Sequence, residues 1–358
     1  TQNPQKLVLI FGGGYDDDED SIDFRSSDSY GNAIYMVDAV KGTVLWSQTK
    51  TSSGAFASMT HAIPSNITVL DTDNNGYSDR MYVGDMAGQL WRFDITNGNT
   101  VATLVTGGVI GSLGAKEITN GSEITLRKNN RTFYNAPDVS MMTSTSGSNY
   151  YNIAIGSGDR ARPKSNTITE DYFFSLRDYN LSAMTQSDYN SLASDPLKIE
   201  DLTTIDGETD NTSNITSGWK LALDRTLHEK SIAQSATISG NVMFTTFISN
   251  TSVDSCTATT GYNRTYTVKL ASGLKYFTDP DTTITTDGNG LYEQFNTTGL
   301  PSQINIVNMG NIKKTIPNEQ VTSTKTKTGT CLSGVSILDS CVEFGSRIKA
   351  FWQDTGSN

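Results

Sequence analysis

Short apolar runs alternate with polar turns along most of this chain. LVLIFGGG (residues 7–14) and MYVGDMAGQLWRFDITNG (81–98) are two such stretches, in which glycine, aspartate and asparagine mark the turns. Short apolar runs bounded by these turn residues are typical of β-strands. Helical periodicity is nearly absent, and DYNSLASDPLK (188–198) predicts only one or two turns of helix. We therefore predict an all-β chain.

One unit of this pattern recurs along the sequence. In its two clearest copies an aromatic residue precedes an aspartate by three positions, and a glycine follows that aspartate by four. These residues are Tyr35, Asp38 and Gly42 in the first copy and Trp91, Asp94 and Gly98 in the second. Weaker copies occupy 150–178 and 241–273, the latter with Tyr266 and Gly273 at the matching places. We expect the three aromatic side chains to be buried between repeats.

Each unit contains three to four short strands, which is the plan of a propeller blade. The expected architecture is a modified β-propeller of repeated antiparallel blades with long loop insertions. One propeller-like domain would span residues 1–358, without the upstream blades, and the polar stretches 99–130 and 180–217 would be insertions. A β-sandwich is the alternative, because it also has strands separated by turns every 8–12 residues.

The strongest chemical signal is an acidic loop over residues 71–79. Oxygen-bearing side chains occupy its positions 1, 3, 5 and 9, and Gly76 occupies position 6. Calcium binds six to eight oxygens, so alternate side chains must converge while glycine permits the sharp turn. The predicted calcium ligands are the side chains of Asp71, Asp73, Asn75 and Asp79 and the carbonyl oxygen of Tyr77. Position 12 is Tyr82, not the glutamate of an EF-hand, and a metal-free asparagine- and aspartate-rich turn is the alternative.

A second acidic run follows the glycine triplet Gly12 to Gly14. It consists of Asp16, Asp17, Asp18, Glu19 and Asp20. Its spacing is irregular, and consecutive carboxylates usually form a solvated loop. Binding of a second cation there is left open.

The charge balance narrows the choice of partners. The chain has 358 residues and a formal net charge of -11, so phosphates of nucleic acid or anionic lipid would be repelled. No stretch approaches the length of about 20 apolar residues that a membrane helix needs, and residue 1 opens no signal peptide. If the protein is exported, we expect its leader to lie outside this fragment.

The three cysteines, Cys256, Cys331 and Cys341, form no zinc motif. Cys331 and Cys341 would close a small disulfide ring in an oxidising compartment, and three unpaired thiols are the alternative. His61 and His228 stand apart from any catalytic motif, and no nucleophile elbow or HExxH sequence is present. We therefore expect a protein that is not an enzyme.

Several segments occur in the same order as in a known family. They are FGGGYD, GNAIYMVDAVKG, LDTDNNGYSDRMYVGDMAGQLWRFD, FYNAPDV, IGSGDRARP, YFFSLRD and GWKLAL. They resemble the C-terminal domain of the PilY/PilC family of type IV pilus tip-associated adhesins and biogenesis factors. The resemblance spans most of 7–310 and is most specific over 70–94.

The resemblance implies a role in pilus biogenesis, surface attachment and twitching motility, with calcium at Asp71 to Asp79 controlling pilus extension against retraction. It further implies export to the periplasm, outer cell surface and pilus tip of a Gram-negative bacterium. The partners would be minor pilins at the pilus tip and a host surface or matrix. Two other classes are kept open: a quinoprotein-like propeller dehydrogenase, which needs a bound quinone, and an integrin-like matrix-binding module.

Overall fold

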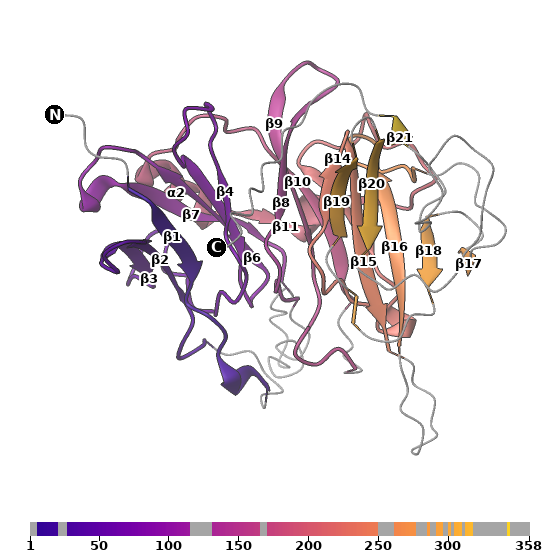
Figure 1. Ribbon diagram of the computed structural model, residues 1–358, viewed down its shortest axis with the longest axis horizontal. Helices are drawn as coiled ribbons and strands as arrows, with labels where there is room; N and C mark the ends of the chain where they lie inside the picture. The colour runs from indigo at the N-terminus through magenta and orange to yellow at the C-terminus, as the bar shows by residue number, and fades with distance from the viewer. Residues whose placement is uncertain are drawn as a thin grey trace, which may run out of the picture.

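The structure is a computed structural model. It describes residues 6–20, 27–114, 131–164, 170–249, 261–276, 285–286, 291–295, 300–301, 304–309, 312–317 and 342–343. It is 9% helical and 42% strand, which confirms the all-β prediction. The described strands form five sheets, and the first four follow one another from left to right in chain order (Figure 1).

The first sheet is a three-stranded antiparallel meander. Its strands are β1 (Val8–Gly12), β2 (Ala33–Asp38) and β3 (Val44–Thr49). Side chains on one face, including Val8 and Ile10, pack toward the second sheet, whereas Leu9 and Phe11 on the other face are exposed. This alternation follows from the period of two in an extended strand.

The three central sheets share one plan, a four-stranded antiparallel meander with a fifth strand at one edge. The second sheet consists of β4 (Thr68–Leu70), β5 (Arg80–Gly84), β6 (Gln89–Ile95), β7 (Val105–Ser112) and the edge strand β11 (Leu197–Lys198). The third consists of β8 (Asp138–Thr143), β9 (Asn149–Gly156), β10 (Tyr172–Asp178), β13 (Gly218–Ala222) and the edge strand β12 (Thr203–Ile205). The fourth consists of β14 (Ala236–Ile238), β15 (Asn241–Ile248), β16 (Tyr262–Lys269), β18 (Tyr292–Phe295) and the edge strand β17 (Thr285–Thr286).

The fifth sheet and a few short helices complete the described elements. The fifth sheet consists of β19 (Ile304–Met309), β20 (Ile312–Pro317) and β21 (Val342–Glu343). The 3-10 helices are η1 (Asp17–Asp20), η2 (Val101–Thr103), η3 (Ile199–Asp201) and η4 (Arg225–Leu227). Within the described ranges, no helix is long and apolar enough to cross a membrane.

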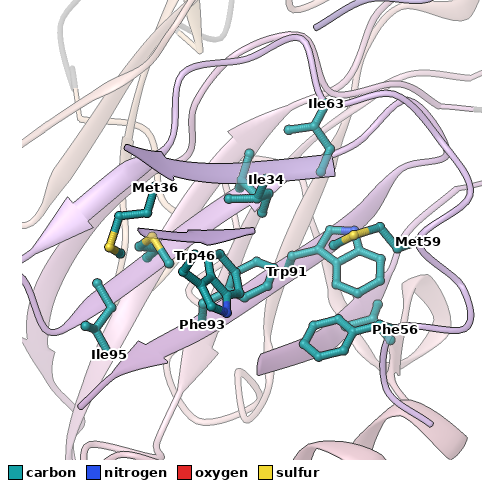
Figure 2. Close-up of a cluster of buried hydrophobic side chains, with 12 residues drawn as sticks. Ile34, Met36, Trp46, Phe56, Met59, Ile63, Trp91, Phe93 and Ile95 are labelled. Carbon is teal, nitrogen blue, oxygen red and sulfur yellow. The ribbon is translucent and has the colours of Figure 1, made fainter. Parts of the chain in front are cut away.

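A hydrophobic cluster joins the first sheet to the second. Ile34 and Met36 of β2 meet Trp91 and Phe93 of β6, and Phe56 from the connecting loop packs among them (Figure 2). The rings of Phe56 and Trp91 stack with centroids 6.4 Å apart. Full burial of each such side chain stabilises the fold by about 1.5–3 kcal/mol, so this cluster fixes how the two sheets pack.

The same arrangement continues through the molecule. Tyr82 and Leu90 of the second sheet pack with Ile153 and Phe174 of the third. The third sheet in turn meets the fourth through Phe173, whose ring lies 3.7 Å from that of Phe244. The first four sheets therefore bury facing surfaces against one another in sequence order, as blades do, and the propeller-like prediction is confirmed.

The repeat seen in the sequence corresponds to equivalent strands and turns. Gly42, Gly98 and Gly273 all adopt positive φ, at 68°, 89° and 74°. Positive φ is strained for other residues, which explains the fixed place of glycine in this turn.

The aromatic positions of the repeat differ between sheets. Trp91 and Tyr266 are buried between sheets, with exposed fractions of 0% and 3%. Tyr35 is only half-buried, because it lies on the outer face of the first sheet and stacks on Phe11. The prediction that all three lie between repeats is therefore wrong for Tyr35.

The stretches predicted as insertions contribute to the sheets. Within 99–130, β7 pairs along its length with β6, so this part is a blade strand, and 115–130 lies outside the described residues. The stretch 180–217 separates two paired strands, β10 and β13, and supplies β11 to the second sheet and β12 to the third. It also contains the helix α2 (Gln186–Ser194), so the insertion links two sheets.

The helix predicted over 188–198 begins and ends earlier. Thr185 and Asp188 form a capping box at its start, in which the Thr185 N–H donates to the Asp188 carboxylate at 2.9 Å. Pro196 disfavours helical conformation at Asp195, where the helix ends. Cys256, Cys331 and Cys341 lie outside the described residues.

Candidate metal site

The acidic loop 71–79 connects β4 to β5 at one end of the second sheet. Its last residue is fixed on both sides by backbone hydrogen bonds. The N–H of Asp79 donates to the carbonyl oxygen of Leu70 at 2.8 Å, and the carbonyl oxygen of Asp79 accepts from the N–H of Ile95 at 2.7 Å. The loop is therefore anchored to both β4 and β6 where it enters β5.

Three of the predicted ligands are brought together. Carboxylate oxygens of Asp71, Asp73 and Asp79 all lie within 4.8 Å of one another. Asp71 and Asp73 are exposed and Asp79 is half-buried, so an ion from solvent can reach them. Three carboxylates this close repel one another unless a cation balances them.

The carboxylate of Asp71 is held by the loop backbone. It accepts hydrogen bonds from the N–H of Gly76 at 2.7 Å and from the N–H of Asn75 at 3.1 Å. The Gly76 hydrogen bond is the main reason that the pKa of Asp71 lies below its ordinary value. Asp71 is therefore held in the charged form that binds a cation.

Asp79 turns its carboxylate back across the loop. One oxygen accepts from the N–H of Thr72 at 2.7 Å and from its hydroxyl at 2.9 Å. The other oxygen accepts from the Asn97 amide at 3.4 Å. Asp79 thus ties the end of the loop to its beginning before any ion binds.

The backbone of the loop takes the two left-handed conformations that a tight turn requires. Asn74 has φ of 59° and Gly76 has φ of 89°. A Cβ atom at Gly76 would meet nothing within 4 Å, so glycine is needed there for its conformation and not for space.

The other two predicted ligands are the side chain of Asn75 and the carbonyl oxygen of Tyr77. The Asn75 side-chain oxygen accepts from the N–H of Tyr77 at 2.8 Å, and its amide donates to Asp73 at 2.8 Å. Their part in binding stays a prediction. The donor set nevertheless contains only hard oxygen ligands, and it fits calcium better than zinc or copper.

The second acidic run has a structural role. Asp16 is buried and accepts hydrogen bonds from the N–H groups of Asp18, Ser29 and Tyr30, at 3.1, 2.8 and 3.0 Å. Burial raises the pKa of Asp16, but these three hydrogen bonds outweigh it, and the pKa lies below its ordinary value. Asp16, Asp17 and Asp18 also bring carboxylate oxygens within 4.8 Å of one another. Asp16 therefore fixes the loop, and the three carboxylates form a second cluster that could hold a cation.

A buried ion network adjoins the acidic loop. Arg80 directly follows Asp79 and binds the carboxylate of Asp94 at 2.7 Å. Arg92 binds the same carboxylate at 2.9 Å and that of Asp178 at 2.8 Å. Burial alone would raise the pKa of Asp94, but the two arginines hold it below its ordinary value.

Sequence reasoning missed this network. Its signal was the pair of charged residues Arg92 and Asp94 alternating with Trp91 and Phe93 in one buried strand. Charged residues are almost never fully buried unless they are paired, so each needed a partner. The partner Asp178 is 86 positions from Arg92, and no local pattern indicates it.

Asp85 is a further buried carboxylate of the second sheet. It accepts from the indole N–H of Trp91 at 2.8 Å, from the backbone N–H groups of Ala87 and Gln89 at 2.9 Å each, and from the Gln89 amide at 3.0 Å. Burial raises the pKa of Asp85 to about 7, against these hydrogen bonds. Asp85 therefore fixes the turn between β5 and β6 and orients the Trp91 ring.

Comparison with known proteins supports the fold. No protein-family model and no curated protein sequence matches this chain. A solved structure does match, the crystal structure of the Pseudomonas aeruginosa PilY1 C-terminal domain, with a TM-score of 0.53 and 16% sequence identity. The chain shares the fold of the PilY1 C-terminal domain. The match covers 80% of this chain and 65% of the PilY1 chain, so this chain spans less than two-thirds of that PilY1 structure.

Proposed function

We propose that this chain is a calcium-binding domain of a type IV pilus biogenesis factor and tip-associated adhesin. Two observations support the proposal. The chain has the fold of the PilY1 C-terminal domain. In the β4–β5 hairpin of its second sheet, a loop brings together the carboxylates of Asp71, Asp73 and Asp79, whose positions in the loop are those of calcium ligands. The carboxylate cluster carries the calcium part of the proposal, because it concentrates negative charge where a divalent ion would relieve it.

The domain acts outside the cytoplasm in this proposal. It is exported to the periplasm and cell surface of a Gram-negative bacterium, where minor pilins at the pilus tip and a host surface or matrix are its partners. Calcium bound at 71–79 biases the pilus toward extension or retraction and so affects twitching and attachment. The domain contributes binding and regulation, and it catalyses no reaction.

A matched pair of variants tests this role in the parent bacterium. Asp79→Ala removes one proposed ligand. Asp210→Ala removes an exposed aspartate whose side chain fixes a turn by accepting hydrogen bonds from the N–H and the hydroxyl of Thr212, at 2.9 and 2.5 Å. We expect Asp79→Ala to leave the protein exported and folded but to change surface piliation and twitching, and Asp210→Ala to change neither.

Normal piliation and twitching in an Asp79→Ala strain whose protein has lost calcium would refute the regulatory role. The bound cofactors of the purified protein test the dehydrogenase alternative, because a stoichiometric quinone would indicate a dehydrogenase. Calcium without a quinone is the expected result.

A further inference from the structure

The segment 178–189 is held to the second sheet by a polar clamp made of Arg80, Arg92 and Asp94. Arg80 donates to the carbonyl oxygens of Asn180 and Leu181 at 3.2 and 3.0 Å. Arg92 donates to the carbonyl oxygens of Asn180 and Ser182 at 2.7 and 2.8 Å. These bonds secure the start of the long connection from β10 to β13.

Asp94 extends the clamp toward helix α2. Its carboxylate accepts from the N–H of Met184 at 2.9 Å and from the hydroxyl of Tyr189 at 2.7 Å. Tyr189 belongs to α2 and is fully buried. Farther along α2, Asn190 accepts from the N–H of Ala55 at 2.9 Å, so the helix also reaches the loop between the first two sheets.

The clamp is arranged to hold or to release as a unit. Two arginines balance two carboxylates, and Arg80, Arg92 and Asp94 are each no more than 2% exposed. Displacing one member would leave a buried charge without compensation, which is far more costly than losing a surface ion pair. Such networks therefore favour one complete arrangement over graded loosening.

The acidic loop and the clamp share a backbone position. Arg80 follows Asp79 without an intervening residue, and Asp79 is fixed by its bonds to Leu70 and Ile95. Repulsion among the carboxylates of the loop strains these two backbone hydrogen bonds, because they hold Asp79 at the end of the loop. A shift of the backbone at Asp79 also moves the Cα atom of Arg80. The hydrogen bonds of the Arg80 guanidinium tolerate a displacement of only a few tenths of an ångström.

We infer that calcium binding at 71–79 is coupled through Arg80 to the docking of segment 178–189 and helix α2 on the second sheet. This inference rests on the proposed calcium site and adds the element that responds to it. Coupling is reciprocal, so a docked segment also raises the affinity for calcium. Calcium occupancy of the loop is thereby transmitted to helix α2, which contacts the second sheet and the loop between the first two sheets.

Amide hydrogen exchange of the full chain with and without saturating calcium measures the coupling directly. Exchange of the Met184 N–H reports opening of the segment, because that N–H donates to Asp94. We expect calcium to slow it about fivefold or more, the lower end of typical coupling between sites. The Lys230 N–H, which bonds Phe247 in the fourth sheet, should be unaffected.

A substitution pair identifies the residue that transmits the effect. Arg80→Lys keeps the charge but loses the forked contacts to the two carbonyl oxygens, so calcium should still bind while its effect on Met184 disappears. Arg177→Lys is the control, since Arg177 binds two other loops through the carbonyl oxygens of Ile215 and Ala271. It should keep the calcium effect.

The outcomes separate the inference from the proposed function. Calcium that slows exchange at Asn75 and Gly76 but not at Met184 would overturn the coupling and leave the metal site intact. A calcium effect that persists in Arg80→Lys would overturn the route through Arg80. If calcium alters no amide of the loop, the proposed metal site itself is wrong. The wild-type comparison decides the coupling even if Arg80→Lys does not fold.

Discussion

Replacing Asp79 by alanine separates the two roles that the structure gives this carboxylate. Without calcium, the variant loses the cap that Asp79 forms with the N–H and hydroxyl of Thr72. Loss of a capping or turn hydrogen bond of this kind costs about 1 kcal/mol. Relief of repulsion with Asp71 and Asp73 partly offsets that cost, so the metal-free variant should be nearly as stable as the metal-free parent.

Calcium should change this comparison. A ligand at a hundredfold excess over its dissociation constant stabilises the native state by about 2.7 kcal/mol. The parent protein gains this increment and Asp79→Ala does not, so the difference in stability between them should grow from less than about 1 to about 3 kcal/mol. Asp210→Ala should gain the full increment.

Urea unfolding in the presence of a chelator and of excess calcium measures both numbers. Tryptophan fluorescence reports unfolding, because Trp91 and Trp219 lie in two different hydrophobic clusters. Equal calcium-induced stabilisation of Asp79→Ala and the parent would refute the assignment of Asp79 as a ligand. A large loss of stability in the chelator would instead show that the carboxylate is mainly structural.

Further predictions concern the buried groups. Asp85→Asn should destabilise the fold by about 2–4 kcal/mol in urea unfolding, because its amide would face the Trp91 N–H with another donor. Burial raises the pKa of Asp85 to about 7 and that of Asp171 to about 6, so the native state binds these protons more tightly than the unfolded chain does. Their contribution to stability is complete below about pH 4 and is lost as the pH rises through 6 to 7, and Asp85→Asn should flatten the measured decline. Phe244→Ala should cost about 3–5 kcal/mol, whereas the half-buried Tyr35→Ala should cost clearly less in the same assay.

The features that the sequence predicts best are local ones. The calcium-like loop and the turn glycines depend on spacings of a few residues, and the structure places Asp71, Asp73 and Asp79 together with Gly76 at positive φ. Stacked sheets follow from the repeat, because each unit needs its neighbours to bury its faces.

Features that depend on distant partners could not be predicted. The contact of Arg92 with Asp178 joins two sheets, and the paired residues of β11 and β7 are separated by 85 intervening positions, so no local pattern indicates either contact. Tyr35 shows that an equivalent position in the repeat need not be equally buried. Its place in the repeat matches Trp91, but no described sheet covers the outer face of the first sheet, so the same position is less buried.

Isothermal titration of the purified full chain with calcium tests the proposed metal site. We expect binding at a single site that Asp79→Ala abolishes and Asp210→Ala preserves. Absence of calcium binding, or binding unaffected by Asp79→Ala, would contradict it.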